Sequence, residues 1–147
     1  MIKLLSVFLL SAFSIAAQGW GTDFEKAKQT AQADHKCILL SFSGSDWCGP
    51  CIRLHKEIYD SEVFLAMADN CLVLVNADFP RQKKNQLGKE LQKRNDKLAD
   101  QYNSSGIFPL TVLLSPDGKL IKKWEGYPGE GKDNFIKEIK DAADAAK

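Results

Sequence analysis

The chain has 147 residues, of which 44% are hydrophobic, and its 20 basic residues nearly balance its 19 acidic ones. This length suits one domain with a single well-buried core, and the composition has no disordered or fibrous bias. The balance of charge argues against nucleic acid as a main partner.

The first residues have the pattern of a cleaved export signal. Lys3 supplies a short positive region, and residues 4–15 form an apolar run that is too short to span a bilayer comfortably. Small residues follow, so we expect a signal peptide over 1–17 and a mature domain over 18–147. Export implies an oxidising compartment, periplasmic or extracellular, where a disulfide persists. An uncleaved membrane anchor is the alternative interpretation.

A helix, a strand and a second helix are expected at the start of the mature chain. Thr22 and Glu25 have the spacing of a capping box, which predicts a helix from there to about Asp34. Residues 37–42 form a short apolar run typical of a buried strand, and residues 48–59 carry apolar residues at helical spacing. The chain therefore passes from a buried strand into a helix near residue 48.

The five residues at this junction are Trp47, Cys48, Gly49, Pro50 and Cys51. A thiolate is the nucleophilic form of cysteine, and a helix N-terminus stabilises it through free N–H groups and the positive end of the helix dipole. Pro50 would lie in the first turn, where its missing N–H costs little. We therefore expect Cys48 to be exposed and activated, with Cys51 one turn deeper.

The middle of the chain predicts one more short helix, a second buried strand and a charged helix. Ser61 is expected to cap the short helix, and residues 71–78 are almost continuously apolar, as in a central parallel strand covered on both faces. From residue 81 to 100, seven basic residues outnumber three acidic ones, and apolar residues recur at helical spacing. The basic face of this extended helix is either solvated or a docking surface for an acidic partner or an anionic surface.

The last third of the chain completes the sheet. Residues 106–114 predict a strand, a turn sequence at 115–118 leads to an antiparallel strand over 119–125, and a terminal helix follows over 132–147. Strands that alternate with helices pair in parallel through right-handed crossovers, and the late hairpin adds an antiparallel pair. We therefore predict an α/β fold in which helices flank a central mixed sheet.

The five-residue motif matches the active-site sequence of thioredoxins at every position, and the chain resembles that family from about Asp23 to its C-terminus. The resemblance implies the thioredoxin fold, with the extended charged helix placed before the cis-proline strand, and it implies protein-disulfide oxidoreductase activity. Cys48 would attack a substrate disulfide, and Cys51 would resolve the mixed disulfide. The resemblance implies no cofactor beyond this dithiol.

The resemblance also implies the shape of the site. It places the family's cis-proline at Pro109, beside the disulfide, where the backbone of Phe108 would pair with the substrate chain. Trp47, Gly49 and Pro50 would shape the rest of the site. The family often has a smaller or β-branched residue before the proline, so Phe108 is a departure that bears on substrate preference.

The groups that handle protons depart further from the family. Thioredoxins bury an aspartate in the strand before the motif, and the equivalent stretch here has Ser41 and Ser43 instead. The lysine that usually neighbours this acid is also absent from the next strand. Either water reaches Cys51 directly, or Asp46 or Glu57 substitutes for the missing carboxylate.

The other two cysteines, Cys37 and Cys71, lie near the starts of adjacent parallel strands in the predicted fold. Export would favour a second disulfide between them, but neighbouring parallel strands rarely offer suitable geometry. We therefore expect free, buried thiols that pack as small hydrophobic side chains.

Metal binding is the competing chemistry for the motif. Cys48, Cys51 and His55 would share one helix face, and two thiolates with an imidazole can hold copper or zinc. Such a site gives Trp47 and Pro50 no role, and His55 is more typical of a helix surface. A copper- or protein-binding module without turnover is the alternative to the enzyme.

The expected partners follow from export and from the motif. We expect a monomer that acts on disulfide-containing protein substrates. The Gly-Pro pair between the cysteines resembles that of the reducing members of the family. A reductant outside the cytosol needs an external electron donor, such as a membrane reductase.

Overall fold

One mixed sheet organises the computed structural model, which describes residues 19–147. Within this range the sheet has four strands in the order β2-β1-β3-β4. β1 (Cys37–Ser43) pairs parallel with β2 (Leu72–Asp78) and antiparallel with β3 (Leu110–Leu114), and β3 pairs antiparallel with β4 (Leu120–Glu125). The predicted mixed sheet is therefore confirmed.

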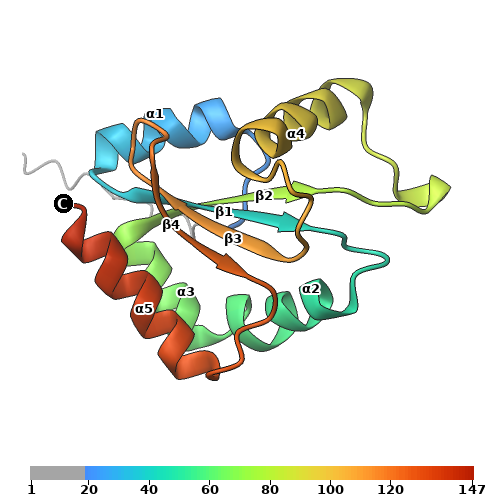
Figure 1. Ribbon diagram of the computed structural model, residues 1–147. Helices are drawn as coiled ribbons and strands as arrows, with labels where there is room; N and C mark the ends of the chain where they lie inside the picture. The colour runs from blue at the N-terminus through green and yellow to red at the C-terminus, as the bar shows by residue number, and fades with distance from the viewer. Residues whose placement is uncertain (1–18) are drawn as a thin grey trace, which may run out of the picture.

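Helices cover both faces of this sheet (Figure 1). α1 (Phe24–Asp34) and α4 (Lys89–Tyr102) lie on one face, and α2 (Gly49–Leu54), α3 (Glu62–Cys71) and α5 (Lys132–Ala145) lie on the other. Because β1 and β2 run parallel, the loops that follow them leave the sheet at the same end (Figure 1). The start of α2 and the segment after β2 therefore lie at one end of the molecule.

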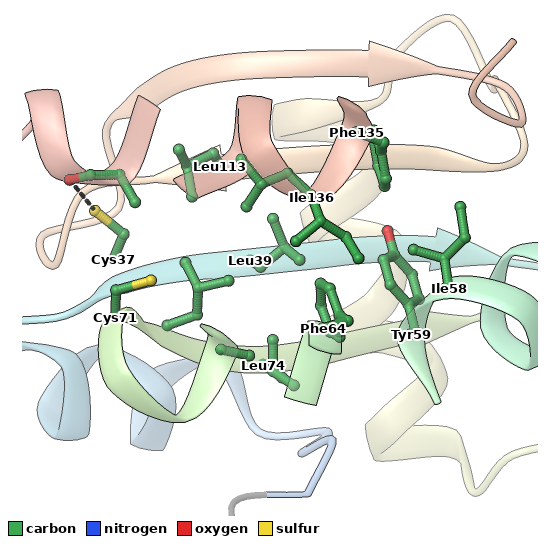
Figure 2. Packing of buried hydrophobic residues seen from close by; sticks show 14 of the residues in the cluster. Cys37, Leu39, Ile58, Tyr59, Phe64, Cys71, Leu74, Leu113, Phe135 and Ile136 are labelled. Carbon is green, nitrogen blue, oxygen red and sulfur yellow. Dashed lines mark hydrogen bonds between the residues drawn. The ribbon is translucent and has the colours of Figure 1, made fainter. Parts of the chain in front are cut away.

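The side chains of β1 alternate between two hydrophobic cores. Leu40 and Phe42 belong to the core beneath α1 and α4, whereas Leu39 belongs to the core beneath the other three helices. In this second core, Cys37 and Cys71 lie at one end and Tyr59 lies at the other (Figure 2). Every residue of β1 is buried, which fits its place inside the sheet.

The first helix begins one residue later than the capping box predicted. Asp23, not Thr22, is the N-cap, and its carboxylate accepts a hydrogen bond from the Lys26 backbone N–H at 3.1 Å. Aspartate caps a helix at least as well as threonine, and its charge also interacts favourably with the helix dipole. The expected cap of the third helix at Ser61 is confirmed, because Ser61 accepts from the Phe64 N–H.

The second strand is an edge strand rather than the predicted central one. β2 stands at the end of the strand order, and among residues 19–147 its outer edge pairs only with Gly21, which hydrogen-bonds on either side of Val75. The apolar run in the sequence reflects burial by helices on both faces, which an edge strand can share with a central one.

The predicted charged helix over 81–100 is shorter than expected. Residues 79–88 form a loop with a single 3-10 turn, η2 (Lys83–Asn85), and α4 begins only at Lys89. The loop is held by hydrogen bonds to Asp46 instead of by helical ones. Gly88, a poor helix former, stands as the N-cap of α4.

The motif helix also changes its pitch. α2 continues into a π-helical turn, η1 (His55–Tyr59), before the chain turns toward α3. Such turns are rare and often lie at functional sites.

Among the helices of residues 19–147, none is long and apolar enough to cross a bilayer. The expected signal peptide over 1–17 lies outside the described residues.

Candidate functional site

A disulfide joins Cys48 to Cys51 at the N-terminus of α2. Cys48 is the N-cap residue, and its sulfur accepts a hydrogen bond from the Cys51 backbone N–H at 3.3 Å. This contact points a free N–H of the helix at the sulfur, as the sequence predicted. The expected exposure of Cys48 is wrong, because its side chain is only 5% exposed, compared with 1% for Cys51. The sulfur turns toward the helix end, which shields it.

Trp47 is fixed over the loop that leads to the motif. Its indole Nε1–H donates to the carbonyl oxygen of Phe79 at 2.7 Å, and its ring packs edge-on against Phe108. A Cβ at Gly44 would come within 2.3 Å of the Trp47 ring, so only glycine leaves room for it. Gly44 therefore accommodates the tryptophan.

Pro109 follows a cis peptide bond with Phe108 and directly precedes β3. The Pro109 carbonyl oxygen accepts a hydrogen bond from the Gly126 backbone N–H at 2.8 Å, which ties this segment to the end of β4. Phe108 packs against both Trp47 and Phe79, with ring centroids 5.4 and 5.5 Å apart. The unusual residue before the proline thus belongs to an aromatic cluster beside the motif.

Asp46 anchors the loop after β2. Its carboxylate accepts from the backbone N–H groups of Arg81 and Gln82 at 2.9 and 3.0 Å and from the Asn85 amide at 3.0 Å. The Arg81 N–H above all, helped by the Asn85 amide, lowers the pKa of this carboxyl. The Arg81 guanidinium lies 3.6 Å from the centre of the Trp47 ring. Asp46 therefore holds a cation against the tryptophan of the motif.

Glu57, the other carboxylate considered for proton handling, makes a different set of contacts. It accepts from the Tyr127 hydroxyl and pairs with Arg53, and these two partners lower its pKa. Neither Glu57 nor Asp46 lines the cavity that borders Cys51. The structure thus brings Asp46 to the rim of the site and places Glu57 on the outer surface of the motif helix.

A cavity of about 310 Å³ lies behind the disulfide. Its walls include Cys51, Ser43, His55, Asp60 and Asn76. His55 is not the surface residue that the sequence suggested, because Trp20 and Tyr59 pack against its ring at 5.2 and 5.0 Å. The π-helical turn carries this imidazole inward. Burial lowers the pKa of His55, so the neutral ring is favoured.

Ser41 lies in β1, the strand where the resemblance leads one to expect a buried acid. It is 0% exposed, and within residues 19–147 its hydroxyl oxygen has no hydrogen-bond partner. Beside it, the Tyr59 hydroxyl lies 2.7 Å from the Thr111 hydroxyl, and burial strongly raises the pKa of Tyr59. The interior side of the site is therefore polar but carries no carboxylate on β1.

Cys37 and Cys71 are free, buried thiols, as expected. Cys37 contacts the Ala143 carbonyl oxygen, and Cys71 donates to the Met67 carbonyl oxygen at 3.3 Å. Burial raises the pKa of both thiols, which disfavours the reactive thiolate. They lie at the start of β1 and the end of α3, at the opposite end of β1 from the motif.

The metal site considered from the sequence is not assembled. Within residues 19–147, no group of three or more His, Cys, Asp or Glu side chains is arranged to hold a metal ion. Cys48 and Cys51 are bonded to each other, and His55 packs against aromatic rings.

Comparison with known proteins agrees with this geometry. A family model described as a thioredoxin-like domain matches residues 24–143. The disulfide bond reductase DsbH of Chlamydia pneumoniae is 34% identical over 119 residues, which cover 81% of this chain and 69% of that protein. A solved DsbH oxidoreductase superposes with a TM-score of 0.77 at 30% identity, covering 98% of this chain and 94% of the other.

More distant relatives share the fold alone. A thioredoxin from Thermus thermophilus superposes with a TM-score of 0.62 at 16% identity, covering 86% of this chain and 87% of that one. The fold and the paired cysteines define a thiol–disulfide oxidoreductase whose redox centre is its own Cys48–Cys51 disulfide. The chain belongs to the thioredoxin-like family.

Proposed function

We propose that this protein reduces disulfides of exported proteins, with Cys48 as the attacking thiol and Cys51 as the resolving thiol. The observation that carries the proposal is the position of the Cys48 sulfur, which accepts the Cys51 N–H at the start of α2. A thiolate at that position gains the same hydrogen bond and the positive end of the helix dipole. The relative named a disulfide bond reductase supports the reducing direction.

The reaction has two displacement steps. The Cys48 thiolate attacks one sulfur of the substrate disulfide, and the other substrate sulfur leaves as a thiolate and takes up a proton. The Cys51 thiolate then attacks the Cys48 sulfur and expels the second substrate thiolate. The substrate gains two electrons and two protons, while Cys48 and Cys51 become a disulfide. The separation of three residues keeps the second step intramolecular and therefore fast.

The remaining site residues position the substrate. Trp47, Gly49 and Pro50 shape the surface around the disulfide, and the backbone of Phe108 pairs with the substrate chain beside Pro109. Trp47 and Phe108 pack edge to face, which supports one continuous wall on this side of the disulfide. Because Asp46 and Glu57 already bind other groups, neither is assigned the Cys51 proton.

The compartment and partners complete the proposal. Export by the signal peptide over 1–17 delivers a monomer to the periplasm or the extracellular space. There it acts on disulfide-containing proteins and receives electrons from an external donor, such as a membrane reductase. The apolar run and the positive residue at the N-terminus support export, and the relative DsbH supports the class of substrate.

The test combines an activity and a potential. The mature protein should accelerate the reduction of insulin by dithiothreitol, and Cys48→Ser and Cys51→Ser should each abolish the acceleration. Equilibration with glutathione should give a potential near that of thioredoxins, about −270 mV. A wild type without activity that retains copper after dialysis would favour the binding module. A potential near about −120 mV, as in strong oxidants, would reverse the direction of electron flow.

A further inference from the structure

The loop over residues 79–88 carries an excess of positive charge and contacts the motif through Asp46 and Trp47. Its sequence contains Arg81, Lys83 and Lys84 but no acidic residue. All three side chains are exposed, and within residues 19–147 none of them forms an ion pair. The carboxylate of Asp46 accepts three hydrogen bonds from this loop, all from uncharged donors.

The loop is held in position and does not merely cross the surface. Three donors in the loop form hydrogen bonds with the carboxylate of Asp46, which lies two residues before Cys48. Arg81 stacks on Trp47, and Trp47 donates in turn to Phe79 at the start of the loop. A cation that is already ordered loses less side-chain entropy when it binds a ligand. Lys83 and Lys84 lie between the anchored residues Gln82 and Asn85.

We propose that this loop binds an acidic segment of the substrate, next to the cysteine that Cys48 attacks. The proposal rests on the proposed function. Arg81 has a planar guanidinium that can bind a carboxylate with two parallel hydrogen bonds, and the two lysines add point charges on the same turn. Carboxylates that flank the target disulfide are attracted to this side of the site, whereas lysines there are repelled.

Because salt screens surface charges, the proposal predicts a salt dependence that can be measured. Charges at a protein surface act over a Debye length of about 8 Å at physiological ionic strength and about 3 Å at 1 M salt. Three positive charges at the rim of a site mainly raise the association rate, by about tenfold at low salt. The preference for acidic substrates should therefore appear in kcat/KM and shrink as salt is added.

The experiment uses three disulfide-linked fluorogenic peptides that carry Glu, Gln or Lys on both sides of the cysteine. The wild type should prefer the Glu peptide to the Lys peptide about tenfold at low salt. The variant Arg81→Gln/Lys83→Gln/Lys84→Gln should lose most of that ratio. A control, Lys26→Gln/Lys93→Gln/Lys97→Gln, removes the same charge from α1 and α4 and should keep it.

A second measurement distinguishes failure of the proposed reductase function from failure of the proposed docking surface. Peptides with serine in place of cysteine test docking without reaction, through fluorescence anisotropy. If wild type binds the Glu peptide more tightly than the Lys peptide but reduces none, the proposed function fails and the docking surface stands. Equal turnover and equal binding of all peptides, or the same ratio in the loop variant, would overturn the docking surface alone.

A different observation supports a second inference, at the interior side of the disulfide. Cys51 needs a group that accepts its proton, and β1 offers only Ser41 and Ser43 there. His55 lies one helical turn after Cys51, and its backbone N–H donates to the Cys51 carbonyl oxygen. Both residues line the cavity of about 310 Å³, which has room for ordered water molecules of roughly 30 Å³ each. The His55 Nε2 atom is buried without a hydrogen-bond partner.

The charged groups around His55 come from several elements. Asp60 follows the π-helical turn, Asp78 ends β2, and Lys56 lines the same cavity. The two carboxylates favour the imidazolium, but burial outweighs them and keeps the ring neutral. The uncharged Tyr59 packs against one side of the ring. A neutral imidazole on a residue that lines the same cavity as Cys51 is a base that can take a thiol proton.

We infer that His55 accepts the proton of Cys51, directly or through water in the cavity, when Cys51 attacks the mixed disulfide. The proton passes from the Cys51 sulfur to the imidazole, the new bond forms between the two cysteine sulfurs, and the substrate leaves as a thiolate. This inference also rests on the proposed function. It assigns to a helix residue the task that the family gives to a strand carboxylate.

The test isolates the second step. His55→Gln should slow release of substrate from the mixed disulfide by about 100-fold at pH 7, and leave alkylation of Cys48 unchanged. In wild type this rate should fall as pH drops through the His55 pKa, and the variant should lose that inflection. Ser41→Asp added to His55→Gln should restore part of the rate. Unchanged release and an unchanged pH profile in His55→Gln would overturn the inference.

Discussion

The disulfide has an outer side, formed by Trp47 and Pro109, and an inner side, formed by the cavity that Cys51 and His55 line. The two sides differ in how closely they follow the family. On the outer side, Trp47, Gly49, Pro50 and the cis-proline Pro109 stand as the resemblance to thioredoxins leads one to expect. On the inner side, β1 offers the buried Ser41 and Ser43 where the resemblance leads one to expect an acid, and His55 lines the cavity behind the disulfide. Apart from Phe108, the residues placed to meet the substrate therefore follow the expected pattern more closely than the groups that move protons do.

The physical reason lies in geometry. Attack on a disulfide needs an approach along the S–S axis, so the backbone around Cys48 and Pro109 has few acceptable shapes. A proton acceptor needs only a suitable pKa and hydrogen-bond reach, which several side chains can provide. The following changes test this contrast, from the largest expected effect to the smallest.

Replacing each sulfur in turn should separate the two sides most sharply. Cys48→Ser should show no reaction with a substrate disulfide, because Cys51 is 1% exposed and out of reach. Cys51→Ser should react once and stop as a stable mixed disulfide, which mass spectrometry detects as an adduct. An adduct on Cys48→Ser would mean that the inner sulfur can attack, and would contradict the assignment of the two sides.

The inner side should also be sensitive to loss of one hydroxyl. Tyr59→Phe leaves the buried Thr111 hydroxyl without the partner it now has at 2.7 Å. An unsatisfied buried group of this kind costs about 1–3 kcal/mol of unfolding free energy. Urea denaturation of the reduced protein measures it, and the double change Tyr59→Phe/Thr111→Val should recover part of the loss. Equal stability of wild type and Tyr59→Phe would show that the pair contributes little.

The sequence predicted the outer side better than the inner side for a physical reason. The motif is contiguous, and the strand-to-helix junction around it follows from local apolar spacing. The anchoring of the loop joins Asp46 to Arg81, 35 positions apart, and no local pattern marks that pair. The burial of His55 depends on Trp20, equally distant along the chain, and on a π-helical turn that a 3.6-residue period does not reveal. The sequence pointed to Asp46 and His55 as residues of interest, but it could not predict their contacts, which come from distant parts of the chain.

The same limit explains the length of the charged helix. Apolar residues at helical spacing continue from Leu87 to Tyr102, so periodicity alone extends the helix toward residue 81. Three hydrogen bonds to Asp46 and the weak helix propensity of Gly88 outweigh that pattern. By contrast, the strands themselves, the helix faces and Ser61 as a cap were predictable, because each depends on residues close together in the sequence.

On the outer side, Asp46→Ala should release the basic loop without unfolding the protein. The three donors from residues 81, 82 and 85 would then turn to water. Hydrogen exchange at residues 81–85 should become faster, and Trp47 fluorescence should change as the Arg81 guanidinium leaves its ring. Asp46→Asn keeps an acceptor oxygen and should have a smaller effect. Protection of the loop that is identical in all three proteins would show that other contacts hold it.

The smallest effect should be a change in how stability depends on pH. Burial lowers the pKa of His55 in the folded protein below its ordinary value of 6.5, so the unfolded chain binds more protons between these two pKa values. The contribution of the neutral ring is therefore complete above about pH 6.5 and is lost as pH falls toward the folded pKa. The urea midpoint of wild type should drop between pH 7.5 and 5.5, and that of His55→Gln should drop less. The carboxylates with lowered pKa values, such as Asp23 and Asp46, titrate well below this window, so they leave the difference between the two proteins intact. If the urea midpoints of the two proteins fell in parallel with pH, the imidazole would be solvated in the folded chain. His55 would then behave like a residue on a helix surface.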